Sequence, residues 1–209
     1  MIVQKLDFST WIDFTQNIDD DQINPYIIKT DTKKILPALG DDLHAAIRLI
    51  SDENPIAWSS TTAYSVNDYA TSGDVVYKAI QAGTNHAVTD TAYWEESPLG
   101  TFWLVYVKPW AVHEIAQKFF IWHGINTTQF GVRVNFSDSD TSIDGKTREA
   151  IIADLASDAG MYKSKMLNYL EDEEWTIDGV EYEVDCTDYK NEPSFSIRPV
   201  GKRKTYTDQ

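Results

Sequence analysis

The stretch GTFWLVYVKPWAVHEIAQKFFIWHG, residues 100–124, is the most apolar run of the chain and decides the expected fold. A helix with apolar residues on every side is typical of the buried centre of a domain. Thr101 could cap this helix, and Gly124 could end it. Pro109 lies inside the run and predicts a kink or two stacked segments, because proline interrupts helical hydrogen bonding. We therefore expect a central core helix that is interrupted near Pro109.

The chain before this run also predicts helices. Ser9 and Thr10 could cap a short one, and the acidic residues 19–21 suit the start of the next, where the peptide dipole is positive. Pro25 fits the first turn of that second helix, and LPALG, residues 36–40, predicts a break. A further helix restarts at residue 41, with one apolar stripe made by Leu43, Ile47 and Ile50.

Beyond the core run, residues 146–173 predict a long amphipathic helix. Its apolar residues recur with the helical period at Ile151, Leu155, Tyr162, Met166 and Leu170. The polar stretch before it contains a short β-like piece at residues 131–136. The stretch WTIDGVEYEVDC, residues 175–186, predicts a β-hairpin with its turn at Asp178 and Gly179.

Residues 54–96 differ from the helical segments on both sides of them. They are rich in aromatic residues, Thr and Ser, they have no helical period, and DVVYKAI, residues 74–80, reads as a strand. Proline lies at both junctions. The expected fold is therefore mainly α: a helical bundle formed by residues 1–53 and 100–175, a small β module inserted at residues 54–99, and a β-hairpin with an extended tail at residues 176–209.

Composition excludes several classes of function. The 209 residues carry a formal net charge of −15, the opposite of what a general nucleic-acid binder needs. Cys186 is the only cysteine, so an intrachain disulfide and a cysteine-rich zinc site are both ruled out. Neither a signal peptide nor an apolar run long enough to span a membrane is evident. These features predict a protein that is made in the cytosol and has no membrane partner.

Motifs for catalysis are not evident in the sequence. His113 and His123 lie ten residues apart on the expected core helix and do not form an i,i+4 metal pair, so we expect His44, His86, His113 and His123 to be ordinary polar residues. Asp138, Asp140 and Asp144 do not have the glycine and glutamate offsets of a calcium loop. We therefore expect no enzymatic activity, no catalytic residue, no metal and no cofactor.

The inserted module shows a pattern of aromatic and small residues. Because about 40 residues bury little surface, its large aromatic side chains are expected to form the core, with Trp58 and Tyr77 buried and Trp94 partly so. The pattern resembles the small carbohydrate-binding modules of the chitin-binding type, through Ala57, Trp58, Tyr64, Asp68, Tyr77, Ala79 and Trp94. Where that family has a glycine before the aspartate this chain has Asn67, and the exposed tryptophans after Tyr-x-Ala are replaced by Ile80 and Gln81. The resemblance implies Trp94 and Tyr93 as candidate carbohydrate contacts, and it leaves a carbohydrate-binding or tail-associated adhesin protein as an alternative function.

The helical parts resemble the head–tail connector proteins of tailed phages, including crAss-like ones. The similarity lies in an acidic helix start, in ILPALGDDL at residues 35–43, and in a later stretch with Lys108-Pro109-Trp110, His123-Gly124-x-Asn126-x-Thr128 and Gly131. The resemblance implies a structural virion protein at the head–tail junction. About twelve copies would form a ring between the portal protein and the tail or the next ring, with head-to-tail contacts between copies. An acidic wall would let DNA pass without sequence-specific binding.

The C-terminal segment, residues 188–209, is expected to leave its own subunit and contact another chain. Phe195, Ile197 and Pro199 alternate with polar residues, as in a strand that is added to a sheet. Lys202, Arg203 and Lys204 form the basic cluster of an otherwise acidic chain, which could be a tail end without a function, a contact with the acidic face of a neighbouring copy or partner, or a contact with DNA. The predicted subunit or portal interface therefore consists of Phe195, Ile197, Lys202, Arg203 and Lys204.

Overall fold

The computed structural model describes residues 1–12, 18–122, 125–128, 131–134, 145–172, 175–177, 180–189 and 192–199. Its helices are α1 (Lys5–Trp11), α2 (Asp20–Thr30), α3 (Leu36–Leu39), α4 (Asp41–Asp52), α5 (Pro98–Phe102), α6 (Lys108–Trp122) and α7 (Gly145–Asp172). Two π-helical segments, η1 (Asp31–Ile35) and η2 (Trp103–Val107), join α2 to α3 and α5 to α6. The fold is mainly helical with a small β-sheet inserted at residues 56–96, as the sequence predicts.

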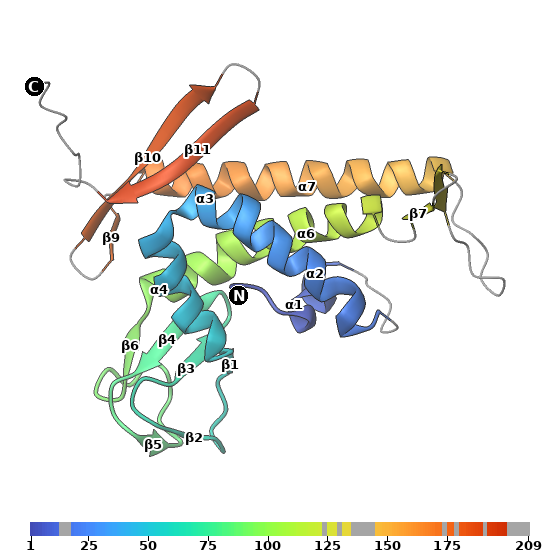
Figure 1. Cartoon of the computed structure of the whole chain (residues 1–209). Coiled ribbons are helices and arrows are strands. Elements are labelled where there is room, and N and C mark those ends of the chain that lie inside the picture. Colours follow the sequence, from blue (N-terminus) through green and yellow to red (C-terminus); the bar gives the residue numbers. More distant parts are fainter. Residues whose placement is uncertain are drawn as a thin grey trace, which may run out of the picture.

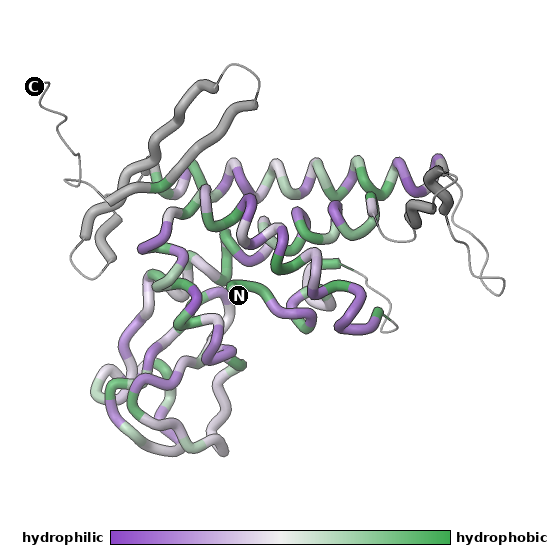
Figure 2. The backbone as a smooth tube through the Cα atoms, in the orientation of Figure 1, coloured by the Kyte–Doolittle hydropathy of each residue, from purple (hydrophilic) through white to green (hydrophobic). Residues whose placement is uncertain are grey.

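The helical body is organised around α6, which packs against α2 and alongside part of α7 (Figure 1). The first half of α6 is buried on all sides, as predicted for the apolar run. Hydrophobic and hydrophilic residues alternate in short groups along α7, in keeping with one buried side (Figure 2). Its buried residues are Leu155, Ala159, Met166 and Leu170. The core therefore joins segments that are far apart in the chain, with Phe8, Ile27, Leu43, Trp110 and Met166 among its members.

Each π-helical segment ends two residues before a proline. The N–H of Leu36 donates to the carbonyl of Asp31, and the N–H of Lys108 donates to that of Trp103, so both bonds span five residues. Pro37 and Pro109 follow at once. Because proline has no N–H and its ring clashes with the carbonyl four residues earlier, a widened turn is a favourable place for it. The interruption predicted near Pro109 takes the form of the π-helical η2, through which the chain stays helical from α5 to α6, and the break predicted across residues 36–40 occurs only at Gly40, whose φ is 76°.

Helix starts differ from the sequence-based expectation at three places. Helix α1 begins at Lys5, ahead of Ser9 and Thr10, and Gln4 and Asp7 form its capping box. The cap of α5 is Ser97 rather than Thr101, because the Ser97 hydroxyl accepts a hydrogen bond from the Gly100 N–H. Pro25 lies inside α2, beyond its first turn, while Asp19 caps that helix as the acidic run predicts. The predicted end at Gly124 lies outside the described residues.

The inserted module contains six short strands below the helical body (Figure 1). They are β1 (Ile56–Ala57), β2 (Ala63–Tyr64), β3 (Tyr69–Ser72), β4 (Val75–Ala79), β5 (Gly83–Thr84) and β6 (Trp94–Glu96). Four of them form a sheet in the order β1-β3-β4-β6, in which only β1 and β3 are parallel, and β2 pairs with β5. Asn67 has a φ of 75° in the turn before β3, so the asparagine takes the left-handed conformation that glycine would favour.

The module is attached to the body at the start of α5. The hydroxyl of Thr101 accepts a hydrogen bond from the Val76 N–H at 3.0 Å, and the Ser97 N–H donates to the Val76 carbonyl at 2.8 Å. Gly100 lies so close to Val76 that a Cβ placed there would come within 2.7 Å of a methyl group of that valine. The insert is therefore packed tightly against α5 and is not joined to the body only by its two connecting segments.

The C-terminal part forms a three-stranded sheet in the order β11-β10-β9, from β9 (Trp175–Ile177), β10 (Val180–Tyr189) and β11 (Glu192–Pro199). The predicted hairpin of β9 and β10 is present, although its turn residues Asp178 and Gly179 lie outside the described ones. A second antiparallel pair, β10 with β11, runs from Tyr182 opposite Pro199 to Tyr189 opposite Glu192. The short β-like piece is also present, as β8 (Gly131–Val134) paired with β7 (Ile125–Thr128).

The expectation that Ile197 contacts another chain is wrong. Its side chain is 2% exposed and belongs to the main core of its own subunit. Strand β11 contacts α3, and a Cβ on Gly40 would meet the Ile197 carbonyl oxygen at 3.0 Å. The alternation at residues 195–199 thus marks a strand of the chain's own sheet, with Ile197 as the side chain that anchors the strand to the helical body.

Candidate functional site

The aromatic residues of the insert form a small core of their own. Tyr64, Ala70, Ala79 and Trp94 are buried together, and the rings of Tyr64 and Trp94 meet edge to face at 4.9 Å. The indole N–H groups of Trp58 and Trp94 both donate to the backbone carbonyl of His86, each at 3.0 Å. Three of the residues that carry the resemblance to carbohydrate-binding modules, Tyr64, Ala79 and Trp94, therefore lie in the core of the module, and Trp58 and Tyr77 pack against it.

This arrangement leaves little aromatic surface for a carbohydrate. Trp94 is only 4% exposed, more buried than expected, whereas Trp58 and Tyr77 are only partly buried. Tyr93 is covered on one face by the ring of His86, with ring centres 3.3 Å apart and planes 10° apart. Stacking on a sugar requires a flat, exposed ring, so the geometry gives Trp94 a packing role and leaves part of Tyr93 at the surface.

Polar side chains in the helical body pair across helices. Lys108 at the start of α6 lies 2.5 Å from the Asp7 carboxylate of α1 and above the ring of Trp103. Asp7 also accepts a hydrogen bond from the Gln4 N–H, so one carboxylate holds both the start of α1 and Lys108. Both charged side chains are about nine-tenths buried, and their pairing satisfies charges that would be costly to bury alone.

Three histidines are described, and each contacts a carboxylate. Nε2 of His44 lies 2.9 Å from Asp31, where α4 meets η1, and Nδ1 of His86 lies 3.4 Å from Asp90 in the insert. Nε2 of His113 lies 3.7 Å from Asp158, and its Nδ1 donates to the Pro109 carbonyl at 2.6 Å, since a carbonyl can only accept. These contacts agree with the ordinary polar roles that the sequence predicts.

The ring of Tyr162 in α7 stacks on the ring of His113, with centres 5.2 Å apart, and meets Trp11 of α1 edge to face. Burial raises the pKa of the Tyr162 hydroxyl above its ordinary value, and the nearby Asp158 carboxylate raises it further. Both effects oppose formation of the phenolate. Tyr162 therefore joins α1, α6 and α7 as a neutral side chain.

A metal site is not found in the part of the chain that the structure describes, where no group of three or more His, Cys, Asp or Glu side chains could hold an ion. His123, Asp138, Asp140 and Asp144 lie outside the described residues. Within the described ranges, no helix is both long and apolar enough to cross a membrane.

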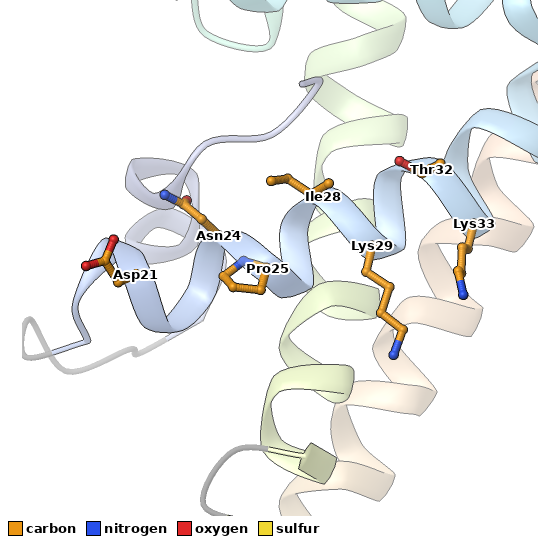
Figure 3. A pocket seen from close by; sticks show the side chains of 7 residues that line it. All are labelled: Asp21, Asn24, Pro25, Ile28, Lys29, Thr32 and Lys33. Atoms are coloured by element: carbon orange, nitrogen blue, oxygen red, sulfur yellow. The ribbon is translucent and has the colours of Figure 1, made fainter.

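One concave surface lies on the outer face of α2 and η1 (Figure 3). An open hollow of about 510 Å³ is centred on Ile28, which is 53% exposed, with Pro25 beside it and Lys29 and Lys33 along one side. The sequence reasoning missed this face, although one signal was available. Ile27 and Ile28 are adjacent in a helix and lie about 100° apart around its axis, so the buried Ile27 and the half-exposed Ile28 mark two different faces of α2.

A second concave surface lies between α4 and the insert. It is a groove of about 320 Å³ whose apolar lining includes Leu49, Tyr69 and Leu99, and Glu95 and Glu96 of β6 line it as well. Leu49 is 71% exposed and is among the most exposed large apolar side chains in the part of the chain that the structure describes. The described surface therefore offers two apolar patches that could contact other chains.

The residues predicted for the subunit interface are placed only in part. Ile197 is buried, as described above, and the side chain of Phe195 lies outside what the structure describes, although its backbone pairs with Cys186. Lys202, Arg203 and Lys204 lie outside the described residues. The described part of this predicted interface is therefore the backbone of β11, which is an edge strand of its sheet.

Neither the curated proteins nor the solved structures include a match to this chain. Residues 37–183 match a family described as "Family of unknown function (DUF6712)". The matched region runs from α3, through the insert and the core helices, into β10, and it spans well over half of the 209 residues. The chain therefore belongs to the family DUF6712.

Proposed function

We propose that this protein is a structural component of a phage virion, a head–tail connector whose copies form a ring between the portal and the tail. The observation that carries the proposal is that both stretches of the resemblance to connector proteins contribute residues to the helical core. Leu39 and Leu43, from the ILPALGDDL stretch, are both fully buried, and Gly40 makes the turn between them. In the second stretch, Lys108 pairs with Asp7 and Trp110 is 1% exposed.

This placement matters because a resemblance that rested on surface residues would say little about the fold. Side chains that define how helices cross are the ones that relatives of a structural protein need to share. Since these residues hold α1, α3, α4 and α6 together, the resemblance concerns the architecture of the body. Architecture is what a connector contributes to the virion.

The charge of the chain fits an assembly that surrounds DNA. With a net charge of −15, a ring of copies would present a negative wall to the phosphate backbone. Such a wall lets DNA slide because it forms few attractive contacts. The proposed ring has about twelve copies by analogy with connectors, the portal protein on one side, and the tail or the next ring on the other.

The decisive experiment is a mass measurement of the purified chain, alone and mixed with the portal protein of the same phage. We expect the chain to bind the portal as a ring, visible by native mass spectrometry and by electron microscopy of the complex. A chain that stays monomeric with portal present, and that is not found in purified virions by peptide mass spectrometry, would refute the proposal.

The alternative, a carbohydrate-binding or adhesin role, is disfavoured by the burial of Trp94. We expect no saturable binding of the full chain to chitin oligosaccharides or other β-linked glycans in calorimetry. Saturable binding that disappears in a Tyr93→Ala variant, with the fold retained, would restore this alternative.

A further inference from the structure

We propose that the copies of this chain join head to tail through the two apolar surfaces described above. The hollow on α2 and η1, called here the α2 surface, contains Pro25, Ile28, Lys29 and Lys33. The groove between α4 and the insert, called here the Leu49 surface, contains Leu49, Glu95 and Glu96. The proposal rests on the proposed ring and identifies which faces of the subunit form it.

The apolar parts of the two surfaces match in kind. On the α2 surface, Ile28 is 53% exposed beside the ring of Pro25, and on the Leu49 surface, Leu49 is 71% exposed. Contact between them would remove two large exposed aliphatic side chains from water at once. Apolar anchors at the centre of a contact with charged groups around them are typical of protein interfaces.

The charges of the two surfaces are complementary. Two lysines, Lys29 and Lys33, and one aspartate, Asp21, line the α2 surface, which gives it a formal charge of +1. Two glutamates, Glu95 and Glu96, and one lysine, Lys78, line the Leu49 surface, which gives it a charge of −1. Lys78 lies 3.9 Å from Glu95, whereas Glu96 has no ion-pair partner in the part of the chain that the structure describes.

The two lysines of the α2 surface are also unpaired. Neither Lys29 nor Lys33 contacts a carboxylate among the described residues, in a chain where acidic side chains outnumber basic ones by 33 to 18. Lys34, the next residue, shows the contrast, because it pairs with Glu114 of α6. An exposed, basic and apolar face on an acidic protein is suited to another copy of the same protein.

We propose a head-to-tail arrangement, in which each copy contacts two different neighbours, rather than a symmetric dimer, in which both contacts form between the same two copies. The two surfaces share no residue, and each copy carries one of each, so a contact leaves one free surface at either end. Head-to-tail contacts of this type close into rings when the rotation between copies allows it. The insert then has a direct part in assembly, because β6 supplies the two glutamates of the Leu49 surface.

Disulfide trapping tests the contact directly. Ile28→Cys and Leu49→Cys are introduced together in a Cys186→Ser chain, which is oxidised mildly at high concentration and run on a non-reducing gel. We expect a ladder of dimer, trimer and higher species, because each copy carries both halves of the bond. Each single-cysteine chain should give dimers at most. A double-cysteine chain that gives no ladder would overturn the proposal.

Matched variants provide the second test. Leu49→Asp should raise the concentration needed for half-assembly by about tenfold or more, because a carboxylate would enter an apolar contact. Leu6→Asp is the control, since Leu6 on α1 is 73% exposed and belongs to neither surface. Equal assembly of the two variants would contradict the proposal.

Charge reversal completes the design. Changing Lys29 and Lys33 to Glu, or Glu95 and Glu96 to Lys, should weaken assembly, and combining the four changes should restore it. Failure of the combination to assemble better than either parent would count against the pairing of these surfaces.

The two proposals fail in different ways. Normal portal-bound rings of the Leu49→Asp variant would overturn the contact and leave the connector function standing. A ladder from a chain that never binds the portal would support the contact and refute the connector function.

Discussion

Two helical glycines should respond to the same substitution with opposite signs. Gly100 lies in α5 against the insert, where an added Cβ would come within 2.7 Å of the Val76 methyl, 2.8 Å of the Val76 Cβ and 2.9 Å of the Ser97 hydroxyl. Gly160 lies in α7, where an added Cβ would meet no atom within 4 Å. Gly100→Ala therefore tests how tightly the insert is packed on the body, with Gly160→Ala as its matched control.

The magnitudes follow from two competing effects. Alanine in place of glycine in a helix stabilises by about 0.5–1 kcal/mol, and Gly160→Ala should show this gain alone. At Gly100 the same gain is opposed by overpacking of about 1–3 kcal/mol, so the net loss should be about 0–2.5 kcal/mol, with a central value of about 1 kcal/mol. For a chain of this size, each 1 kcal/mol corresponds to a shift in Tm of about 2–4 °C.

Urea unfolding followed by circular dichroism, together with calorimetry, measures both variants. We expect the free energy of unfolding to fall for Gly100→Ala and to rise for Gly160→Ala, with a gap of about 2 kcal/mol between them. If Gly100→Ala is as stabilising as Gly160→Ala, the insert does not press against α5 as described, and the reasoning is refuted.

Three other predictions concern the insert, the C-terminal sheet and Tyr162. Replacing residues 54–96 with a short Gly/Ser linker should leave a helical protein that unfolds cooperatively, because the insert has a separate aromatic core. Loss of cooperative unfolding in denaturant would contradict this prediction. Ile197→Ala should cost about 2–5 kcal/mol of stability, since the side chain is 2% exposed, and a change below 0.5 kcal/mol in urea unfolding would mean that β11 is not docked. The raised pKa of Tyr162 stabilises the fold below the ordinary tyrosine value of 10.0, and this contribution should be lost as pH rises through the higher folded value. Tyr162→Phe should reduce this loss of stability at alkaline pH. If thermal scans between pH 9 and 11 show the same loss of stability in the variant, groups other than Tyr162 cause it.

The region around residues 36–40 shows which helices hydrophobic periodicity predicts correctly and where it fails. The helical stripe of α4 at Leu43, Ile47 and Ile50 is buried as predicted, because those positions follow one uninterrupted helix. Before it, Ile23 and Ile27 are buried in α2 and Ile35 in η1. A regular helix would bring residue 34 rather than 35 to that face, and the wider π turn shifts the pattern by one residue. Pro37 and Gly40 close together predicted a break across residues 36–40, although the chain stays helical through Pro37 as far as Gly40.

The C-terminal error has a different origin. The alternation around Ile197 correctly indicated a strand, but a period of two does not say which strand or helix lies alongside. The partners are β10 and α3, and α3 lies more than 150 residues away in the chain. The Leu49 surface was missed for the same reason, because it combines α4 with β6 and exists only once the insert is folded against the body.

The backbone carbonyl of His86 accepts hydrogen bonds from both Trp58 and Trp94, and this affects how far the sequence of the insert can vary. Both indoles of the module are held by a main-chain oxygen, which every amino acid possesses, so the identity of residue 86 is not what ties them together. Substitutions at this position can therefore accumulate without loosening the core, provided the backbone path is kept. In a mutational library of the insert, position 86 should tolerate many replacements, while Trp58 and Trp94, which supply the donors, should tolerate few.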